Sequence, residues 1–240
     1  MSLGGSALYI ESVLESSLTK DSKPSLSRTG QMGDVMKESS TIAYTFSKSL
    51  LLRKFPNRKF FERAGIHMHV PEGSTPKDGE WRDLLFFFFW KTSLPPFLLF
   101  IFFLLLPIFV ISVMEYQLSS SYALQLHPFQ GPSAGVTMTT ALLSLALNQP
   151  ILPNIAMTGE LTLTGKVLKI GGVKEKTIAA KRCGVTTILF PAANASDWKE
   201  LPDYVKEGMD ATFVDWYDEI FEKVFDTKAL GDKETWIMEK

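Results

Sequence analysis

One apolar run constrains this sequence more than any other feature. Residues 84–114 read LLFFFFWKTSLPPFLLFIFFLLLPIFVISVM, and positions 92–114 carry no charge. About 20 apolar residues can cross a bilayer as a helix. The three prolines of the run argue against an unbroken helix, because proline removes a backbone donor and clashes with the preceding turn, although membrane helices tolerate it better than soluble ones. Residues 92–114 therefore leave three interpretations open: a membrane span, a non-native segment and a buried core element.

The whole chain nevertheless has the composition of a folded protein. With 45% hydrophobic and 21% charged residues, it is neither disordered nor collagen-like. Its 25 basic residues nearly balance its 26 acidic ones, which gives no electrostatic argument for binding nucleic acid or anionic lipid through the chain as a whole. The single cysteine, Cys183, cannot form an internal disulfide, and the N-terminus does not resemble a secretory signal. We expect a reducing compartment.

Hydrophobic spacing outside the apolar run predicts interleaved strands and helices, which is typical of an α/β fold. Residues 19–29 are polar and are expected to form a loop, and Asp34 is expected to cap the helix that follows. We expect strands at 6–13, 66–70, 155–158, 167–170 and 186–190, and helices at 34–47, 133–147, 174–183, 197–206 and 218–225.

Ser133 is the first candidate for chemistry, since it lies among small residues in GPSAG (131–135) at the start of an expected helix. Backbone N–H groups and the helix dipole can stabilise an oxyanion there, but serine is also a preferred N-cap, so both roles fit. Lys176 follows 43 residues later, after two glycines and before an apolar run. A lysine packed into a core loses hydration and its pKa falls, so it can take a proton from a serine hydroxyl.

Other candidates are less specific. His67 and His69 share one strand face and could bind a metal, but the sequence shows no third ligand, and a supporting role beside the site is the alternative. Thr158 and Glu160 flank a glycine turn that could face a cleft or be an ordinary turn. Asn194 begins a glycosylation sequon, which matters only in a secreted protein. The chain has no G-x-x-x-x-G-K-[ST] loop, so we expect no phosphate-binding loop and no nucleotide site in it. We also expect no metal and no other cofactor.

Five blocks of the sequence form a pattern specific enough to indicate a family. They read TGQMGDVMKES (29–39), HMHVPEGSTPKDG (67–79), GPSAG (131–135), MTGELTLTGKVLKIGGVKEKTIAAKR (157–182) and DEIF (218–221). Together they resemble the C-terminal proteolytic domain of the Lon family of ATP-dependent proteases. The resemblance covers nearly all of residues 3–79 and 131–226 and is closest to organellar members, mitochondrial or peroxisomal.

The resemblance implies a Ser–Lys dyad, with Ser133 as the nucleophile and Lys176 as the general base at the family's spacing. It also implies an α/β (α+β) domain with the ribosomal protein S5 domain 2-like fold, assembled as a hexameric ring that degrades unfolded or damaged proteins. ATP is used by an ATPase module that this chain lacks, and we expect the mitochondrial matrix, with the peroxisome as the alternative. The residues implied to line or support the site are Thr158, Glu160, His69, His67 and Asp78.

The sequence departs from the family at one place. In Lon domains PKDG runs directly into PSAG, whereas here 52 extra residues intervene. We therefore predict a discontinuous Lon domain at 1–79 and 131–228, an insertion at 80–130 and a C-terminal tail at 229–240. Codons that can encode the two ends of the insertion fit splice sites in one reading frame, which favours a retained intron. The alternative is a membrane-anchored, catalytically inactive Lon-like protein in which residues 92–114 span the bilayer.

Overall fold

The computed structural model describes residues 6–15, 18, 22–30, 32–71, 121–127 and 131–227. The chain divides into two compact units, one formed by Met1–Ser74 and Ser120–Lys240 and the other by Thr75–Ser119. The second unit includes Asp78 and residues 92–114, so the predictions made for them lie outside the described residues. Within the described part, no helix combines the length and apolar character needed to cross a membrane.

The first unit is a mixed α/β domain. Its described strands are β1 (Ser6–Leu14), β2 (Ser25–Gly30), β3 (Gly65–Val70), β4 (Ser121–His127), β5 (Ile155–Met157), β6 (Glu160–Leu161), β7 (Val167–Leu168), β8 (Thr187–Pro191) and β9 (Asp210–Val214). Its described helices are α1 (Asp34–Lys54), α2 (Phe60–Arg63), α5 (Gly135–Leu147), α6 (Val173–Arg182), α7 (Ala195–Lys199), α8 (Asp203–Lys206) and α9 (Tyr217–Val224), with 3-10 turns η1 (Pro132–Ala134) and η2 (Ala192–Asn194).

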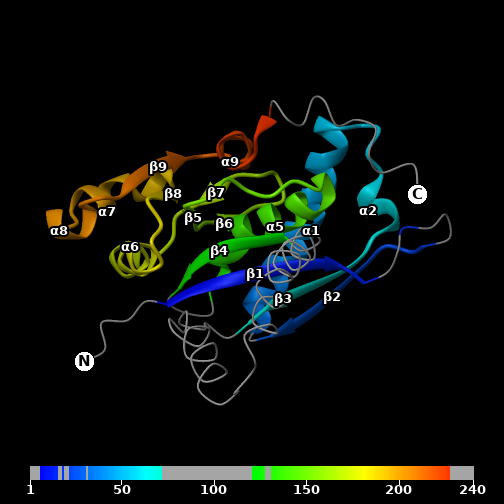
Figure 1. Cartoon of the computed structure of the whole chain (residues 1–240), viewed down its shortest axis with the longest axis horizontal. Coiled ribbons are helices and arrows are strands. Elements are labelled where there is room, and N and C mark those ends of the chain that lie inside the picture. Colours follow the sequence, from blue (N-terminus) through cyan, green and yellow to red (C-terminus); the bar gives the residue numbers. More distant parts are fainter. Residues whose placement is uncertain are drawn as a thin grey trace, which may run out of the picture. The chain divides into compact units, whose positions relative to one another are not determined.

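Seven of the strands form one sheet in the order β2-β3-β1-β4-β5-β8-β9 (Figure 1). Strand β1 is antiparallel to both β3 and β4, whereas β2–β3, β4–β5, β5–β8 and β8–β9 are parallel pairs. Strands β6 and β7 pair separately as a small antiparallel sheet.

Both faces of the sheet are covered by helices. Because side chains alternate along a strand, Met157 and Leu189 enter one core with α1, α5 and α9. Ala156 and Ile188, their immediate neighbours in sequence, enter a second core with α6. The short parallel strands are therefore apolar on both sides, as expected for an α/β arrangement.

The predicted helix at 133–147 is confirmed, with its first turn formed as the 3-10 turn η1. All thirteen residues of α5 are buried, including its polar ones. Thr139 and Thr140 donate to the carbonyl oxygens four residues earlier, at 2.9 Å in both cases. Burial of these hydroxyls therefore leaves no donor unsatisfied, and α5 can serve as a rigid core helix behind Ser133.

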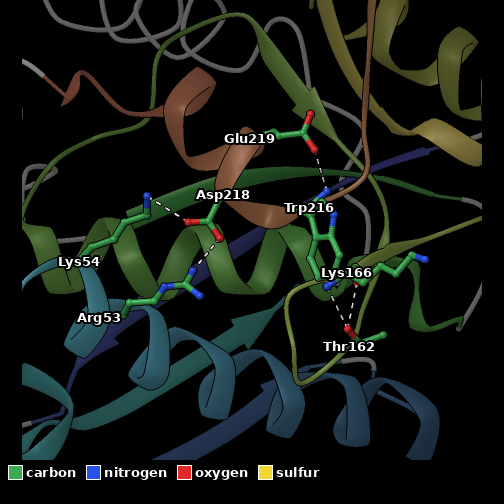
Figure 2. Close-up of polar contacts among 7 residues, drawn as sticks. All are labelled: Arg53, Lys54, Thr162, Lys166, Trp216, Asp218 and Glu219. Atoms are coloured by element: carbon green, nitrogen blue, oxygen red, sulfur yellow. Dashed lines mark hydrogen bonds and ion pairs between the residues drawn. The ribbon is translucent and has the colours of Figure 1, made fainter.

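Helix α9 is anchored to the C-terminal end of α1, which gives the DEIF block a structural role. Asp218 forms ion pairs with Arg53 at 2.7 Å and Lys54 at 3.1 Å, as Figure 2 shows. Glu219 accepts a hydrogen bond from the backbone N–H of Trp216 at 2.9 Å. Acidic residues in the first turn of one helix and basic residues in the last turn of another also suit both helix dipoles.

Three local predictions are wrong. Within 19–29, which we predicted to be a loop, β2 begins at Ser25 and pairs with β3; as an edge strand with polar side chains it shows no apolar alternation. The helix predicted at 197–206 is two short helices interrupted at Pro202, since proline lacks the N–H that a continuous helix needs. Asp34 lies inside α1, whose N-cap is Gly33 and has no side-chain cap.

Strand β4 was also not anticipated. It lies within residues 80–130, which were assigned to the insertion, yet it occupies the position between β1 and β5 in the main sheet. Its sequence, SYALQLH, alternates polar and apolar residues as a half-buried strand does. Part of the interval 80–130 thus belongs to the same unit as the domain.

Candidate active site

Ser133 lies in η1, which leads directly into α5. Its backbone carbonyl accepts a hydrogen bond from Gly159 N at 2.8 Å and another from Thr158 Oγ1 at 3.2 Å. On the preceding residue, the carbonyl of Pro132 accepts from Ser39 Oγ of α1 at 3.3 Å. The turn that carries Ser133 is therefore held from the loop after β5 and from α1.

Two glycines allow this close approach. A Cβ atom on Gly135 would lie 2.9 Å from the backbone nitrogen of Leu161, and one on Gly159 would lie 2.6 Å from a methyl group of Val167. Both distances are shorter than any side chain tolerates. Glycine is thus required where η1 and α5 meet the small β6–β7 sheet.

Lys176 comes from the other side of the sheet, on α6. This helix begins after Gly172, which adopts a left-handed conformation with φ +72°, and its first turn is closed by Lys176 N donating to Gly172 O at 3.0 Å. Only 2% of the Lys176 residue is exposed. Its amine Nζ donates to Ser133 Oγ at 2.9 Å and to Thr158 Oγ1 at 2.9 Å. Side chains from η1, from the loop after β5 and from α6 therefore meet at one point.

Burial changes the protonation of this lysine. Loss of hydration lowers the pKa of Lys176 from 10.5 to about 8. An amine with that pKa is about one-quarter neutral at pH 7.5, whereas an ordinary exposed lysine is almost wholly protonated there. The neutral amine can accept a proton from a hydroxyl 2.9 Å away while donating its own hydrogens to Thr158, so this arrangement can activate a serine nucleophile.

The other predicted residues lie in different surroundings. Glu160 begins β6, two residues after Thr158, and is half-buried. His67 and His69 lie on β3, where both rings hydrogen bond to Thr29 Oγ1 at 2.8 Å. Nowhere among the described residues do three histidine, cysteine or acidic side chains form a group able to hold a metal. The predicted residue Asp78 falls outside the described part.

Sequence reasoning missed two residues that the structure connects to this site. Ser39 holds the backbone of η1 from α1, but serine in a helix gives no sequence signal for such a contact. Asn194 was considered only as a glycosylation sequon, whereas it is fully buried and hydrogen bonds to the backbone just before α6.

Comparison with known proteins identifies the family. Residues 1–82 and 126–227 match the Lon protease (S16) C-terminal proteolytic domain. The unmatched interval 83–125 falls inside residues 80–130, which were predicted to be an insertion.

Several curated relatives carry the name "Lon protease homolog, mitochondrial". The Eremothecium gossypii protein is 48% identical over 223 residues, covering 93% of this chain and 16% of the relative. The Kluyveromyces lactis protein is 47% identical over 234 residues, covering 98% and 16% respectively, and the Saccharomyces cerevisiae protein is 47% identical over 232 residues, covering 97% and 16%. The chain thus spans about 16% of the length of these relatives. Because both comparisons extend over most of the chain, it belongs to the Lon protease family, as a serine protease domain of the C-terminal proteolytic type.

Proposed function

We propose that this chain is a serine endopeptidase domain in which Ser133 attacks the substrate carbonyl and Lys176 acts as the general base. The observation that supports this most strongly is the position of Lys176 Nζ, 2.9 Å from Ser133 Oγ and 2.9 Å from Thr158 Oγ1. With a pKa of about 8, Lys176 is partly neutral near pH 7.5 and can therefore accept a proton. A serine and a lysine 43 residues apart in sequence reach hydrogen-bond distance only because α5 and α6 both pack on the central strands.

The proposed reaction has two steps. In the first, Ser133 Oγ forms a bond to the peptide carbonyl carbon while its proton moves to Lys176 Nζ, and the resulting oxyanion is stabilised by N–H groups at the start of the helix. The ammonium then gives this proton to the leaving amine as the C–N bond breaks, which leaves an acyl-enzyme. In the second step water attacks the acyl carbon and gives a proton to Lys176 Nζ. The ammonium then returns this proton to Ser133 Oγ as the bond between Oγ and the acyl carbon breaks, which releases the carboxylic acid product and restores the neutral lysine.

Thr158 has a supporting role in this proposal. Its hydroxyl accepts a hydrogen bond from Lys176 Nζ and donates to the carbonyl oxygen of Ser133 at 3.2 Å. The side chain is 1% exposed, so these bonds form away from water. Thr158 therefore fixes the direction of the amine relative to the nucleophile. We retain Glu160 and Asp78 as supporting residues. We propose that His67 and His69 hold β3 to β2 through their hydrogen bonds to Thr29.

The wider setting follows from the family and is likewise proposed. The named relatives are mitochondrial Lon proteases, so we propose the mitochondrial matrix, with the peroxisome as the alternative. Unfolded or damaged proteins are the proposed substrates, and a hexameric ring with the ribosomal protein S5 domain 2-like fold in each subunit is the proposed assembly. We propose that ATP acts through an ATPase module outside this sequence and that the domain itself needs no cofactor for peptide hydrolysis.

The proposed function is tested by single and double substitutions at the dyad. Ser133→Ala and Lys176→Ala should each abolish ATP-independent cleavage of a fluorogenic peptide, and the double variant should be no worse than either, because residues acting as one unit are non-additive. Ser47→Ala is a matched control, since its hydroxyl bonds only within α1, to Ala43 O at 2.7 Å. Activity that survives in Lys176→Ala but disappears in Lys174→Ala would show that the wrong lysine was chosen.

A further inference from the structure

Asn194 connects β8 to the start of α6. It is the last residue of η2, directly after β8, and it is fully buried. Its Oδ1 accepts a hydrogen bond from Ile170 N at 3.0 Å, while its Nδ2 donates to Ile170 O at 2.8 Å. One amide therefore holds both polar backbone atoms of a single residue, and its burial is incompatible with the glycosylation that the sequon could otherwise permit.

Asp197 determines which way this amide points. Asn194 Nδ2 also donates to Asp197 Oδ2 at 2.7 Å, and Lys169 pairs with the same carboxylate at 3.2 Å. The hydrogen bond from Asn194, together with the one from Lys169, lowers the pKa of Asp197, so the carboxylate stays ionised and can only accept. The amide must therefore present its NH₂ group to Asp197, which leaves Oδ1 facing Ile170 N.

The segment that Asn194 holds leads directly into α6. Ile170 is followed by Gly171 and Gly172, and glycine adopts many backbone conformations at low cost. Local chain stiffness therefore does not determine the direction in which α6 leaves this turn. The two bonds to Ile170 supply a fixed point two residues before the N-cap of the helix that carries Lys176.

The other partner of Lys176 is held by the same strand. Thr158 N donates to Leu189 O at 3.2 Å, and β5, which precedes Thr158, pairs with β8 in parallel. The start of α6 and the hydroxyl that receives the Lys176 hydrogen bond are thus both positioned by β8 and the turn after it. Small movements of α6 relative to β8 would change the distance between Nζ and both hydroxyls.

We propose that Asn194 is a positioning residue of the dyad, holding the start of α6 to β8 so that Lys176 Nζ stays between the hydroxyls of Ser133 and Thr158. This inference rests on the proposed roles of Ser133 and Lys176. In this proposal Asn194 makes no contact with the substrate. Loss of the two hydrogen bonds from Asn194 to Ile170 lets α6 move and admits water around the amine, and restored hydration favours the protonated lysine.

Hydration is the main control on the protonation of Lys176. Burial lowers the pKa of Lys176, and Lys174 and Glu175 precede it on its own helix. The titratable groups on the described elements packed against α6 include Tyr9 and Glu11 of β1, Asp197 and Lys199 of α7, and Asp203 and Lys206 of α8. A change in hydration is therefore the route by which Asn194 would act on the amine.

The test uses the full chain in detergent micelles, with lysine labelled by ¹³C at Cε and the Lys176 signal assigned by its loss in Lys176→Met. In the wild type this signal should titrate at about pH 8. In Asn194→Ala the midpoint should rise by about one pH unit. Peptide hydrolysis at pH 7.5 should then fall about eightfold in kcat, because the neutral fraction of the base falls by that factor, with little change in KM and recovery at pH 10.

Two further variants separate an effect on the Lys176 midpoint from a general loss of stability or folding. Ile220→Val removes a buried methyl group from α9, in the other core, and serves as a control whose melting temperature falls without a change in the Lys176 midpoint. Asn194→Ser keeps a polar side chain at the position and is used if Asn194→Ala does not fold. An unchanged Lys176 midpoint in a folded Asn194 variant would overturn the inference. Absence of peptide cleavage in a wild type that titrates at about pH 8 would contradict the proposed function instead.

Discussion

Replacing Lys176 by methionine should stabilise the protein at neutral pH while abolishing its proposed activity. The Lys176 residue is 2% exposed, and burial lowers the pKa of its amine from 10.5 to about 8. Holding the pKa of a group below its unfolded value by that interval costs the folded state about 3 kcal/mol when the lysine is protonated. Methionine has a similar length and no charge, so Lys176→Met should gain most of this free energy of unfolding.

The pH dependence separates this cost from ordinary packing effects. Below about pH 8 the lysine is protonated in both states and the whole cost is present. Between pH 8 and 10.5 the folded state loses the proton before the unfolded state does, so the stability of the wild type rises with pH relative to the variant. Above pH 10.5 the lysine is neutral in both states, so this cost in free energy is absent.

Urea unfolding followed by circular dichroism, at one-unit steps from pH 6 to 11, measures this difference directly. The stability of Lys176→Met relative to the wild type should be about 3 kcal/mol greater at pH 7 than at pH 11. Lys181→Met is the matched control, because it removes an exposed lysine, and not a buried one, from the same helix. If the difference in free energy of unfolding between Lys176→Met and the wild type stays constant from pH 7 to 11, the reasoning is refuted.

Three further predictions follow from the packing around the site. Thr158→Val removes the hydroxyl that receives the second hydrogen bond of the base, and should lower kcat of peptide hydrolysis about tenfold with little change in KM; an unchanged kcat would exclude the supporting role. Gly159→Ala should lower the free energy of unfolding in urea by about 1–3 kcal/mol because its Cβ would lie 2.6 Å from a side chain of β7. Gly171→Ala, whose Cβ has no neighbour within 4 Å among the described residues, is its control and should change little. Deleting residues 84–114 should leave a chain with native circular dichroism, whereas deleting 79–130 also removes β4 and should reduce cooperative unfolding; equal stability of the two would contradict the place of β4 in the sheet.

Much of the fold could be predicted from sequence because its elements carry strong periodicity. The buried helix α5 and the strand β3 lie where their apolar patterns predicted them. Edge strand β2 could not be found in this way, since none of its residues is fully buried and no apolar alternation is required. Strand β4 has a readable alternation, but its proximity to the apolar run led to its assignment to the insertion.

The main residues of the candidate site could be predicted from the sequence, but the residues that hold them in place could not. A serine among small residues and a lysine before an apolar run are local patterns, and they pointed to Ser133 and Lys176 before their distance was known. The hydrogen bonds that hold these residues come from positions distant in sequence, as with Ser39 and Asn194. No local pattern encodes a contact between elements that meet only in the folded chain.

The dependence of kcat/KM on pH tests the central claim most directly, because it reports the ionisation of the free enzyme's essential base. The measurement uses a fluorogenic peptide from pH 5.5 to 10, in the wild type and in Lys176→Arg. If Lys176 is the base, kcat/KM should rise with unit slope to a plateau, with a midpoint at about pH 8, and Lys176→Arg should be inactive throughout. A midpoint near pH 6.5, the ordinary range of histidine, with activity retained in Lys176→Arg would contradict the account and direct attention to His67 and His69.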